Sequence, residues 1–157
     1  MNKAKSYVIS IILSLGTGLL SSFLTSDNMD IYDSIITPTL SPPSILFPIV
    51  WTVLYVLMGI SAAIIYNTPT SETDSKAKAL STYGISLIVN FLWSIIFFNL
   101  QNYLFAFIWL VLLWILVLKT FLEYSKISKT AAYLQIPYLL WLTFAGYLSL
   151  SIWLLNS

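Results

Sequence analysis

The chain has 157 residues, of which 59% are hydrophobic and only 8% are charged, whereas soluble domains are about 25% charged. The surface of a soluble domain of this length needs many more charged side chains than this chain has. The composition therefore predicts an integral membrane protein. The chain has no cysteine and no histidine, which excludes disulfides and thiolate chemistry and removes the commonest metal ligand. A net charge of +1 gives no electrostatic basis for binding nucleic acid. We therefore expect no metal site and no nucleic-acid partner.

Five apolar stretches follow one another along the chain, and each approaches the roughly 20 residues that a helix needs to cross a bilayer. We place these predicted spans at residues 6–24, 44–66, 80–98, 103–122 and 131–155. They predict an all-α integral membrane protein, a five-transmembrane-helix bundle that forms a single domain over residues 1–157. The first stretch exceeds the apolar core of a signal peptide and no cleavage site follows it, so we expect it to stay in the protein.

The basic residues are all lysines and occupy alternate ends of the predicted spans: Lys3, Lys5, Lys76, Lys78, Lys119, Lys126 and Lys129. The connections at residues 26–43 and 99–102 contain none. By the positive-inside rule, this distribution predicts a cytoplasmic N-terminus and a C-terminus outside. Because the chain uses lysine without any arginine, our working hypothesis for its location is a bacterial cell membrane.

The connection at residues 26–43 is the longest in the chain and lies on the predicted outer side. It contains several acidic residues together with Tyr32 and four apolar side chains, among them Ile35 and Leu40. The apolar content favours a segment that packs over the helices as a lid. The alternative is a disordered acidic linker.

Small residues recur every four positions in the first predicted span, at Ser10, Ser14, Gly18 and Ser22. Such a ridge lets a neighbouring helix approach closely through its backbone. We favour packing within the bundle over a dimer seam, because five helices must pack against one another.

No ionisable residue falls in the central third of any predicted span. This argues against a proton-coupled antiporter and a voltage sensor, which need charged groups in the membrane. The polar residue that remains is Asn90, three positions before Trp93 and therefore on the same helix face. Asn90 either bonds a neighbouring helix or presents its amide to a ligand, and the sequence leaves both alternatives open.

Two predicted spans carry a proline about one turn before a tryptophan, with Pro48 preceding Trp51 and Pro137 preceding Trp141. A proline inside a helix removes a backbone hydrogen bond, so we expect both helices to bend there. A bend leaves space, and an indole offers a flat face with one donor. The pattern predicts a cavity for a flat, largely apolar ligand. The alternative is that both rings only fill the core.

Several motifs resemble the TspO/MBR family of tryptophan-rich sensory proteins, which includes the mitochondrial translocator protein, a benzodiazepine receptor. They are the stretch from Pro42 to Phe47, the WTVLY motif that begins at Trp51, the NFLWS motif at Asn90 and the PYLLW motif at Pro137. These motifs fall in order over the second, third and fifth predicted spans. The resemblance therefore covers essentially the whole chain.

The resemblance implies a homodimer with one ligand pocket in each subunit and no required cofactor. It implies binding of porphyrins such as protoporphyrin IX and of isoquinoline-carboxamide and benzodiazepine-type drugs. The positions that match or flank the family's pocket are Trp51, Trp141, Asn90, Ala145, Pro42, Pro43, Phe47 and Trp93, and Tyr32 of the long connection is a further candidate.

Three functions follow from this pocket. The leading hypothesis is a receptor or sensor-like protein that binds porphyrins in the bilayer. The second is an enzyme that degrades porphyrin in light, with Trp51 and Trp141 as the candidate catalytic residues, because the spans offer no acid–base pair. The third is a tetrapyrrole or lipid transporter, although the sequence shows neither a coupling residue nor an inverted repeat.

Overall fold

The computed structural model describes residues 2–25, 34–37, 45–70 and 73–156. Helices form nearly all of the described chain. In order along the sequence they are α1 (Lys3–Thr25), α3 (Leu46–Asn67), α4 (Thr73–Ser94), the π-helical segment η2 (Ile95–Asn99), α5 (Tyr103–Ser125), α6 (Lys129–Tyr133) and α7 (Ile136–Asn156).

Five helical segments of the described chain are long and apolar enough to cross a membrane, and they are Lys3–Thr25, Leu46–Asn67, Asp74–Asn99, Tyr103–Ser125 and Lys129–Asn156. They correspond one to one with the five predicted spans. The largest difference is in the third span, which was predicted to begin at residue 80. There α4 begins at Thr73, about two turns earlier, and Asp74 in its first turn suits the positive end of the helix dipole.

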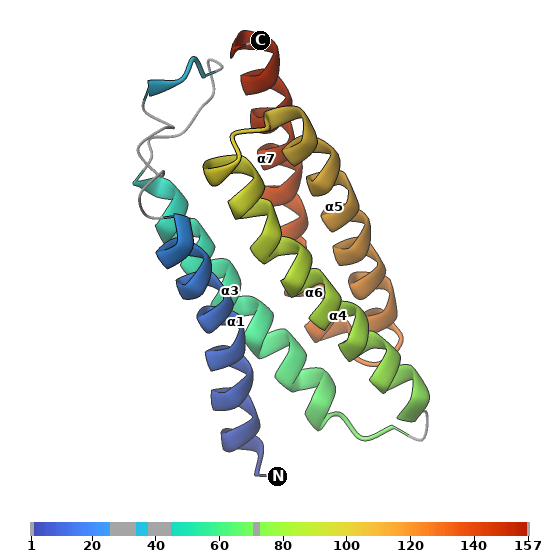
Figure 1. The fold of residues 1–157 in the computed structure, drawn as a ribbon. Helices are drawn as coiled ribbons and strands as arrows, with labels where there is room; N and C mark the ends of the chain where they lie inside the picture. Colours follow the sequence, from blue (N-terminus) through green and yellow to red (C-terminus); the bar gives the residue numbers. More distant parts are fainter. Residues whose placement is uncertain (1, 26–33, 38–44, 71–72, 157) are drawn as a thin grey trace.

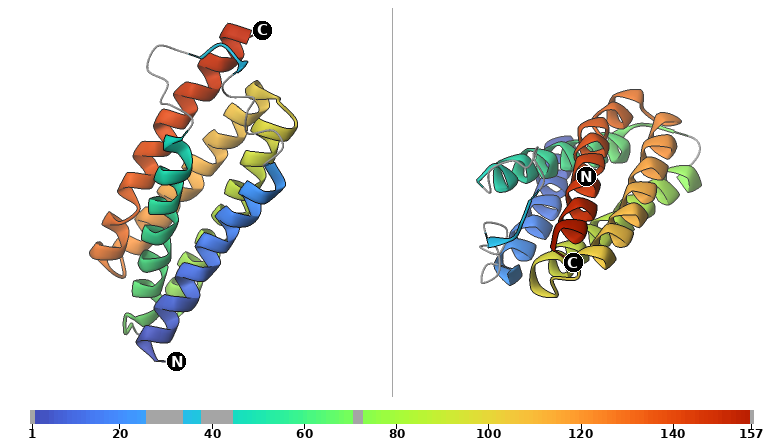
Figure 2. Two further views of the ribbon diagram at one scale, coloured as in Figure 1. Left: turned by 90° about the vertical axis from the view of Figure 1, so that its left-hand side faces the viewer. Right: turned by 90° about the horizontal axis from the view of Figure 1, so that it is seen from above.

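The long helices form one elongated bundle, with the two termini at opposite ends (Figures 1 and 2). α1 packs along α3, while α5 packs between α4 and α7. The buried core runs through the middle of the bundle and is built from aliphatic and aromatic side chains of α3, α4, α5 and α7.

α1 joins α3 through its small residues. The Ser10 hydroxyl donates to the Gly59 carbonyl over 2.7 Å, and the Ser14 hydroxyl donates to the Tyr55 carbonyl over 2.6 Å. A Cβ atom at Gly59 would lie 2.6 Å from the Ile11 Cα, so only glycine permits this backbone approach. The prediction that the small-residue ridge packs within the bundle is confirmed for Ser10 and Ser14.

The two prolines have different consequences. Because α3 begins at Leu46, Pro48 lies in its first turn, where a missing N–H costs nothing. The predicted bend at Pro48 is therefore wrong. Pro137 is the second residue of α7, directly after a break at Leu134 and Gln135 that separates α6 from α7. The expected bend in the fifth span is thus a full interruption.

Side-chain hydrogen bonds satisfy backbone groups at the break between α6 and α7. Ser61 of α3 donates to the carbonyl of Ala131 over 2.7 Å, and the Gln135 amide donates to the Ser61 hydroxyl over 3.0 Å. Both Ser61 and Gln135 are buried. A break in a membrane helix is tolerated where neighbouring groups satisfy the freed backbone, and Ser61 does this here.

The described part of the long connection, residues 34–37, is attached to the end of α7. The Ile36 N–H donates to Oδ1 of Asn156 over 3.0 Å, and Nδ2 of Asn156 donates to the Ile36 carbonyl over 2.8 Å. Ile35 packs against the buried core. The predicted lid otherwise falls outside the described residues, so it stays a prediction.

Candidate ligand-binding site

A cavity lies in the half of the bundle that contains the C-terminus, between α1, α3, the end of α4 with η2, and α7. Its aromatic lining residues are Phe47, Trp51, Tyr55, Trp93, Phe97, Phe98 and Trp141. Its small or hydroxyl-bearing lining residues are Gly18, Ser21, Ser22, Thr25, Ser94, Ala145 and Ser149. The free volume of the cavity is about 70 Å³.

Trp51 is the centre of the aromatic lining. Its ring centroid lies 6.3 Å from that of Trp141 at an interplanar angle of 88°, and 6.4 Å from that of Trp93 at 37°. Phe47 meets Trp141 edge-on at 5.8 Å, and Phe97 stacks on Trp93 at 5.2 Å. These edge and offset contacts are the arrangements that aromatic rings prefer, so the rings form a continuous wall.

The structure brings together most of the side chains that the sequence singled out. Five of the predicted site residues line the cavity, and they are Phe47, Trp51, Trp93, Trp141 and Ala145. Tyr32, Pro42 and Pro43 lie outside the described residues.

Asn90 is buried and is absent from the cavity lining. Its Oδ1 accepts a hydrogen bond of 2.9 Å from the Tyr55 hydroxyl, and its Nδ2 donates to the Tyr138 hydroxyl over 2.5 Å. Tyr55 lines the cavity, and Tyr138 meets the Trp51 ring edge-on at 6.1 Å. Asn90 thus joins α3, α4 and α7 and holds in place two aromatic residues beside the cavity. The sequence left open whether Asn90 bonds a neighbouring helix or faces a ligand. The contacts show that it bonds neighbouring helices.

Two parts of the lining were not identified from the sequence. The first is α1, which contributes Ser21, Ser22 and Thr25, although the repeat that ends at Ser22 indicated this face. The second is η2, which contributes Phe97 and Phe98. A π-helical turn rotates the residues after it relative to an α-helix, and no residue pattern in the sequence predicts this turn.

Three polar atoms on lining residues are buried without a hydrogen-bond partner among the described residues. They are the indole Nε1 atoms of Trp93 and Trp141 and the hydroxyl of Ser149. By contrast, Nε1 of Trp109, outside the cavity, donates to the Val89 carbonyl over 2.8 Å. Buried donors are normally paired, so unpaired ones at a cavity indicate a place for an acceptor.

Trp141 also lines a second hollow, on the outer surface of the bundle between α3 and α7. The other side chains there are apolar and include Val53, Pro137 and Leu140. Val53 and Leu140 are exposed, so this hollow faces the membrane. The Trp141 ring therefore forms part of the wall between the cavity and the bilayer.

The sequence profile of the TspO/MBR family matches residues 9–154, which include every described lining residue of the cavity. The chain belongs to the TspO/MBR family.

Individual TspO relatives cover most of the chain. It is 39% identical to the tryptophan-rich protein TspO of Archaeoglobus fulgidus over 151 residues, 96% of each chain. It is 37% identical to the tryptophan-rich protein TspO of Chlorobaculum tepidum over 125 residues, 80% of this chain and 78% of the relative. The translocator protein of Bos taurus is 28% identical over 144 residues, 92% of this chain and 85% of the relative. The chain is therefore a multi-pass membrane protein of this family.

Proposed function

We propose that this protein is a membrane receptor or sensor-like protein that binds flat, largely apolar ligands in the aromatic cavity. Porphyrins such as protoporphyrin IX are the ligands we favour, and isoquinoline-carboxamide and benzodiazepine-type compounds share their planar apolar character. The observation that carries the proposal is that three buried polar groups in the aromatic lining have no hydrogen-bond partner among the described residues. They are Nε1 of Trp93, Nε1 of Trp141 and the Ser149 hydroxyl. Apolar walls with a few placed polar groups are typical of small-molecule sites.

The size of the cavity requires that it opens when a ligand binds. Its 70 Å³ is far below the roughly 300–1,000 Å³ of ordinary ligand pockets. Rotation of the Trp141 ring would enlarge the cavity, since the membrane-facing hollow on its other side offers room for the ring. We therefore propose that a ligand enters from the bilayer between α3 and α7 as Trp141 moves.

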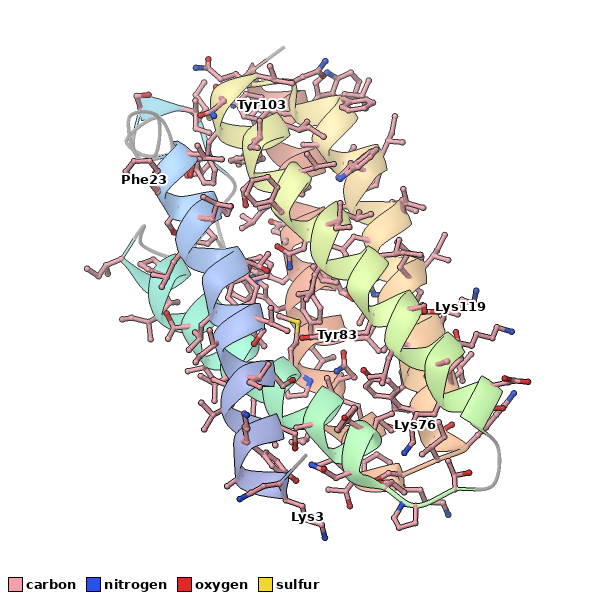
Figure 3. The ribbon with its side chains drawn as sticks, turned by 60° about the horizontal axis from the view of Figure 1, so that its bottom comes forward. Lys3, Phe23, Lys76, Tyr83, Tyr103 and Lys119 are labelled. Atoms are coloured by element: carbon pink, nitrogen blue, oxygen red, sulfur yellow. The ribbon has the colours of Figure 1, made fainter. Side chains whose placement is uncertain are left out.

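We also propose that the end of the bundle that carries the lysines faces the cytoplasm. Figure 3 shows Lys3 and Lys76 toward the same end, opposite Phe23 and Tyr103. The positive-inside rule supports this orientation, in which the cavity lies in the outer half of the membrane.

A titration with protoporphyrin IX in darkness tests the binding site. Ala145 is buried and lines the cavity, so Ala145→Phe places a ring in the space that the ligand needs. We expect saturable quenching of tryptophan fluorescence in the wild type, weaker binding in the Ala145→Val variant and none in Ala145→Phe. The matched control is Ile115→Phe on the membrane-facing side of α5, which should bind like the wild type. Equal affinity in all four proteins would contradict the proposed site.

Light-dependent porphyrin breakdown is a second candidate function for the same cavity. The observation that favours it is the cluster of three indoles, in which Trp51 lies 6.4 Å from Trp93 and 6.3 Å from Trp141. An illuminated porphyrin generates an oxidant from dioxygen, and the electron-rich indoles lie beside the place where that oxidant would form. Dioxygen supplies both the oxidising equivalents and the oxygen atoms for opening the porphyrin ring.

The second function is tested by illuminating the protein–porphyrin mixture and following the loss of porphyrin absorbance. We expect Trp51→Phe to keep dark binding, because a phenyl ring retains the apolar contact, and to lose most of the light-dependent breakdown. Trp109→Phe on α5, outside the cavity, serves as the control that retains breakdown. Equal breakdown by Trp51→Phe and the wild type would remove this function and leave the binding proposal intact.

A further inference from the structure

A separate hollow lies toward the opposite end of the bundle, between α1 and α4 and over α3. We call it the lysine-end groove and define it by Ile9, Leu13, Ala62, Ala63, Tyr83 and Gly84. Its volume is about 320 Å³, several times that of the aromatic cavity. Figures 1 and 3 show the reason, since α1 and α4 diverge toward this end and leave α3 between them.

Small residues keep the groove open. Ala62 and Ala63 form part of its floor, and a Cβ atom at Gly84 would meet nothing within 4 Å. Ile9 and Leu13 stand at its edge and are exposed on the membrane-facing surface. The groove is therefore an apolar space that opens to the bilayer, where the hydrocarbon chain of a lipid can reach it.

Both walls of the groove end in a lysine. Along α1, Lys3 precedes Ser6 by three positions and so continues the groove face, and Lys76 precedes Leu80 by four positions on α4. The Lys76 ammonium donates to the carbonyls of Tyr66 and Thr68 over 3.1 and 2.6 Å.

These two bonds hold the Lys76 ammonium at the end of α3, beside Tyr66, which lines the groove. An ammonium group has three donors, so one donor of Lys76 remains for an anionic group outside the protein. The described acidic side chain nearest in sequence is Asp74, which is exposed in the first turn of α4.

We propose that the lysine-end groove binds one anionic phospholipid. Its acyl chain lies along Leu13 and Gly84, and its phosphate lies between Lys3 and Lys76. The apolar groove supplies affinity for the chain and the two ammonium groups supply the preference for an anionic headgroup. The site shares no lining residue with the aromatic cavity, so it stands independently of the proposed porphyrin binding.

Native mass spectrometry of the full chain in detergent tests this site, with phosphatidylglycerol and phosphatidylcholine as the probes. We expect the wild type to retain one phosphatidylglycerol and to prefer it over phosphatidylcholine. Gly84→Leu fills the groove without a backbone clash and should release both lipids, with Gly84→Val in between. Gly16→Leu is the matched control, because Gly16 also has open space around it but lies outside the groove.

The headgroup contacts have their own variants. Lys3→Gln combined with Lys76→Gln should reduce the preference for phosphatidylglycerol by roughly 25-fold, about fivefold for each lysine at an anionic surface. The control pair Lys126→Gln and Lys129→Gln removes the same charge at another part of the same end and should keep the preference. Wild-type retention of lipid by Gly84→Leu would overturn the groove site. An unchanged preference in the Lys3 and Lys76 double variant would overturn the headgroup assignment.

Discussion

At the scale of single residues, the cavity depends on a polar contact beside it. Asn90 is a buried amide that bonds the hydroxyls of Tyr55 and Tyr138 from two other helices. A buried hydrogen bond between membrane helices contributes modestly to stability, but an unpaired hydroxyl in the core is costly. The value of Asn90 therefore lies mainly in keeping these two tyrosines paired and oriented.

Replacing Asn90 by leucine should destabilise the protein by about 1–2 kcal/mol, because both tyrosine hydroxyls lose a partner in the core. Thermal unfolding in detergent measures this loss. The triple variant that adds Tyr55→Phe and Tyr138→Phe removes the unpaired hydroxyls and should recover most of it. If Asn90→Leu unfolds at the wild-type temperature, the three-helix contact does not stabilise the bundle as described.

At the scale of elements, the position of α1 is set by how closely its backbone approaches α3. Gly59 faces the Ile11 backbone, and Gly18 faces the Tyr55 ring so closely that a Cβ atom would overlap it. Because Tyr55 also lines the cavity, the packing of α1 determines one wall of the ligand site.

Gly59→Ala should separate α1 from α3 and destabilise the protein by about 1–3 kcal/mol, since the added methyl group meets backbone that cannot rotate away. Gly16→Ala is the control, because nothing lies within 4 Å of its added Cβ atom and alanine has the higher helix propensity. Unfolding in detergent should therefore show a lower midpoint for the first variant only. Equal midpoints would contradict the close approach of these helices.

At the scale of the whole molecule, the sequence predicted the number, order and approximate limits of the spans. Hydropathy over some 20 residues is a strong signal, because no water satisfies backbone groups inside a bilayer. The Trp51 and Trp141 positions were predicted to share a cavity, and the structure places both in its lining.

The details that the sequence did not predict depend on helix limits and tertiary contacts. Pro48 was expected to bend α3, but its effect depends on a helix start only two residues away. Asn90 was placed on the correct helix face, yet only the neighbouring hydroxyls show that it bonds tyrosines beside the cavity. The π-helical turn at η2, which contributes Phe97 and Phe98 to the cavity lining, has no local residue signature.

The most direct test of the central claim is to map which of the six tryptophans is oxidised when bound protoporphyrin IX is illuminated briefly. Peptide mass spectrometry reads each position, with a dark sample as the reference. We expect Trp51, Trp93 and Trp141 to be oxidised first, because they line the proposed site, while Trp109 and Trp114 on α5 react later. Oxidation that is uniform, or that begins at the α5 tryptophans, would contradict a porphyrin site in the aromatic cavity.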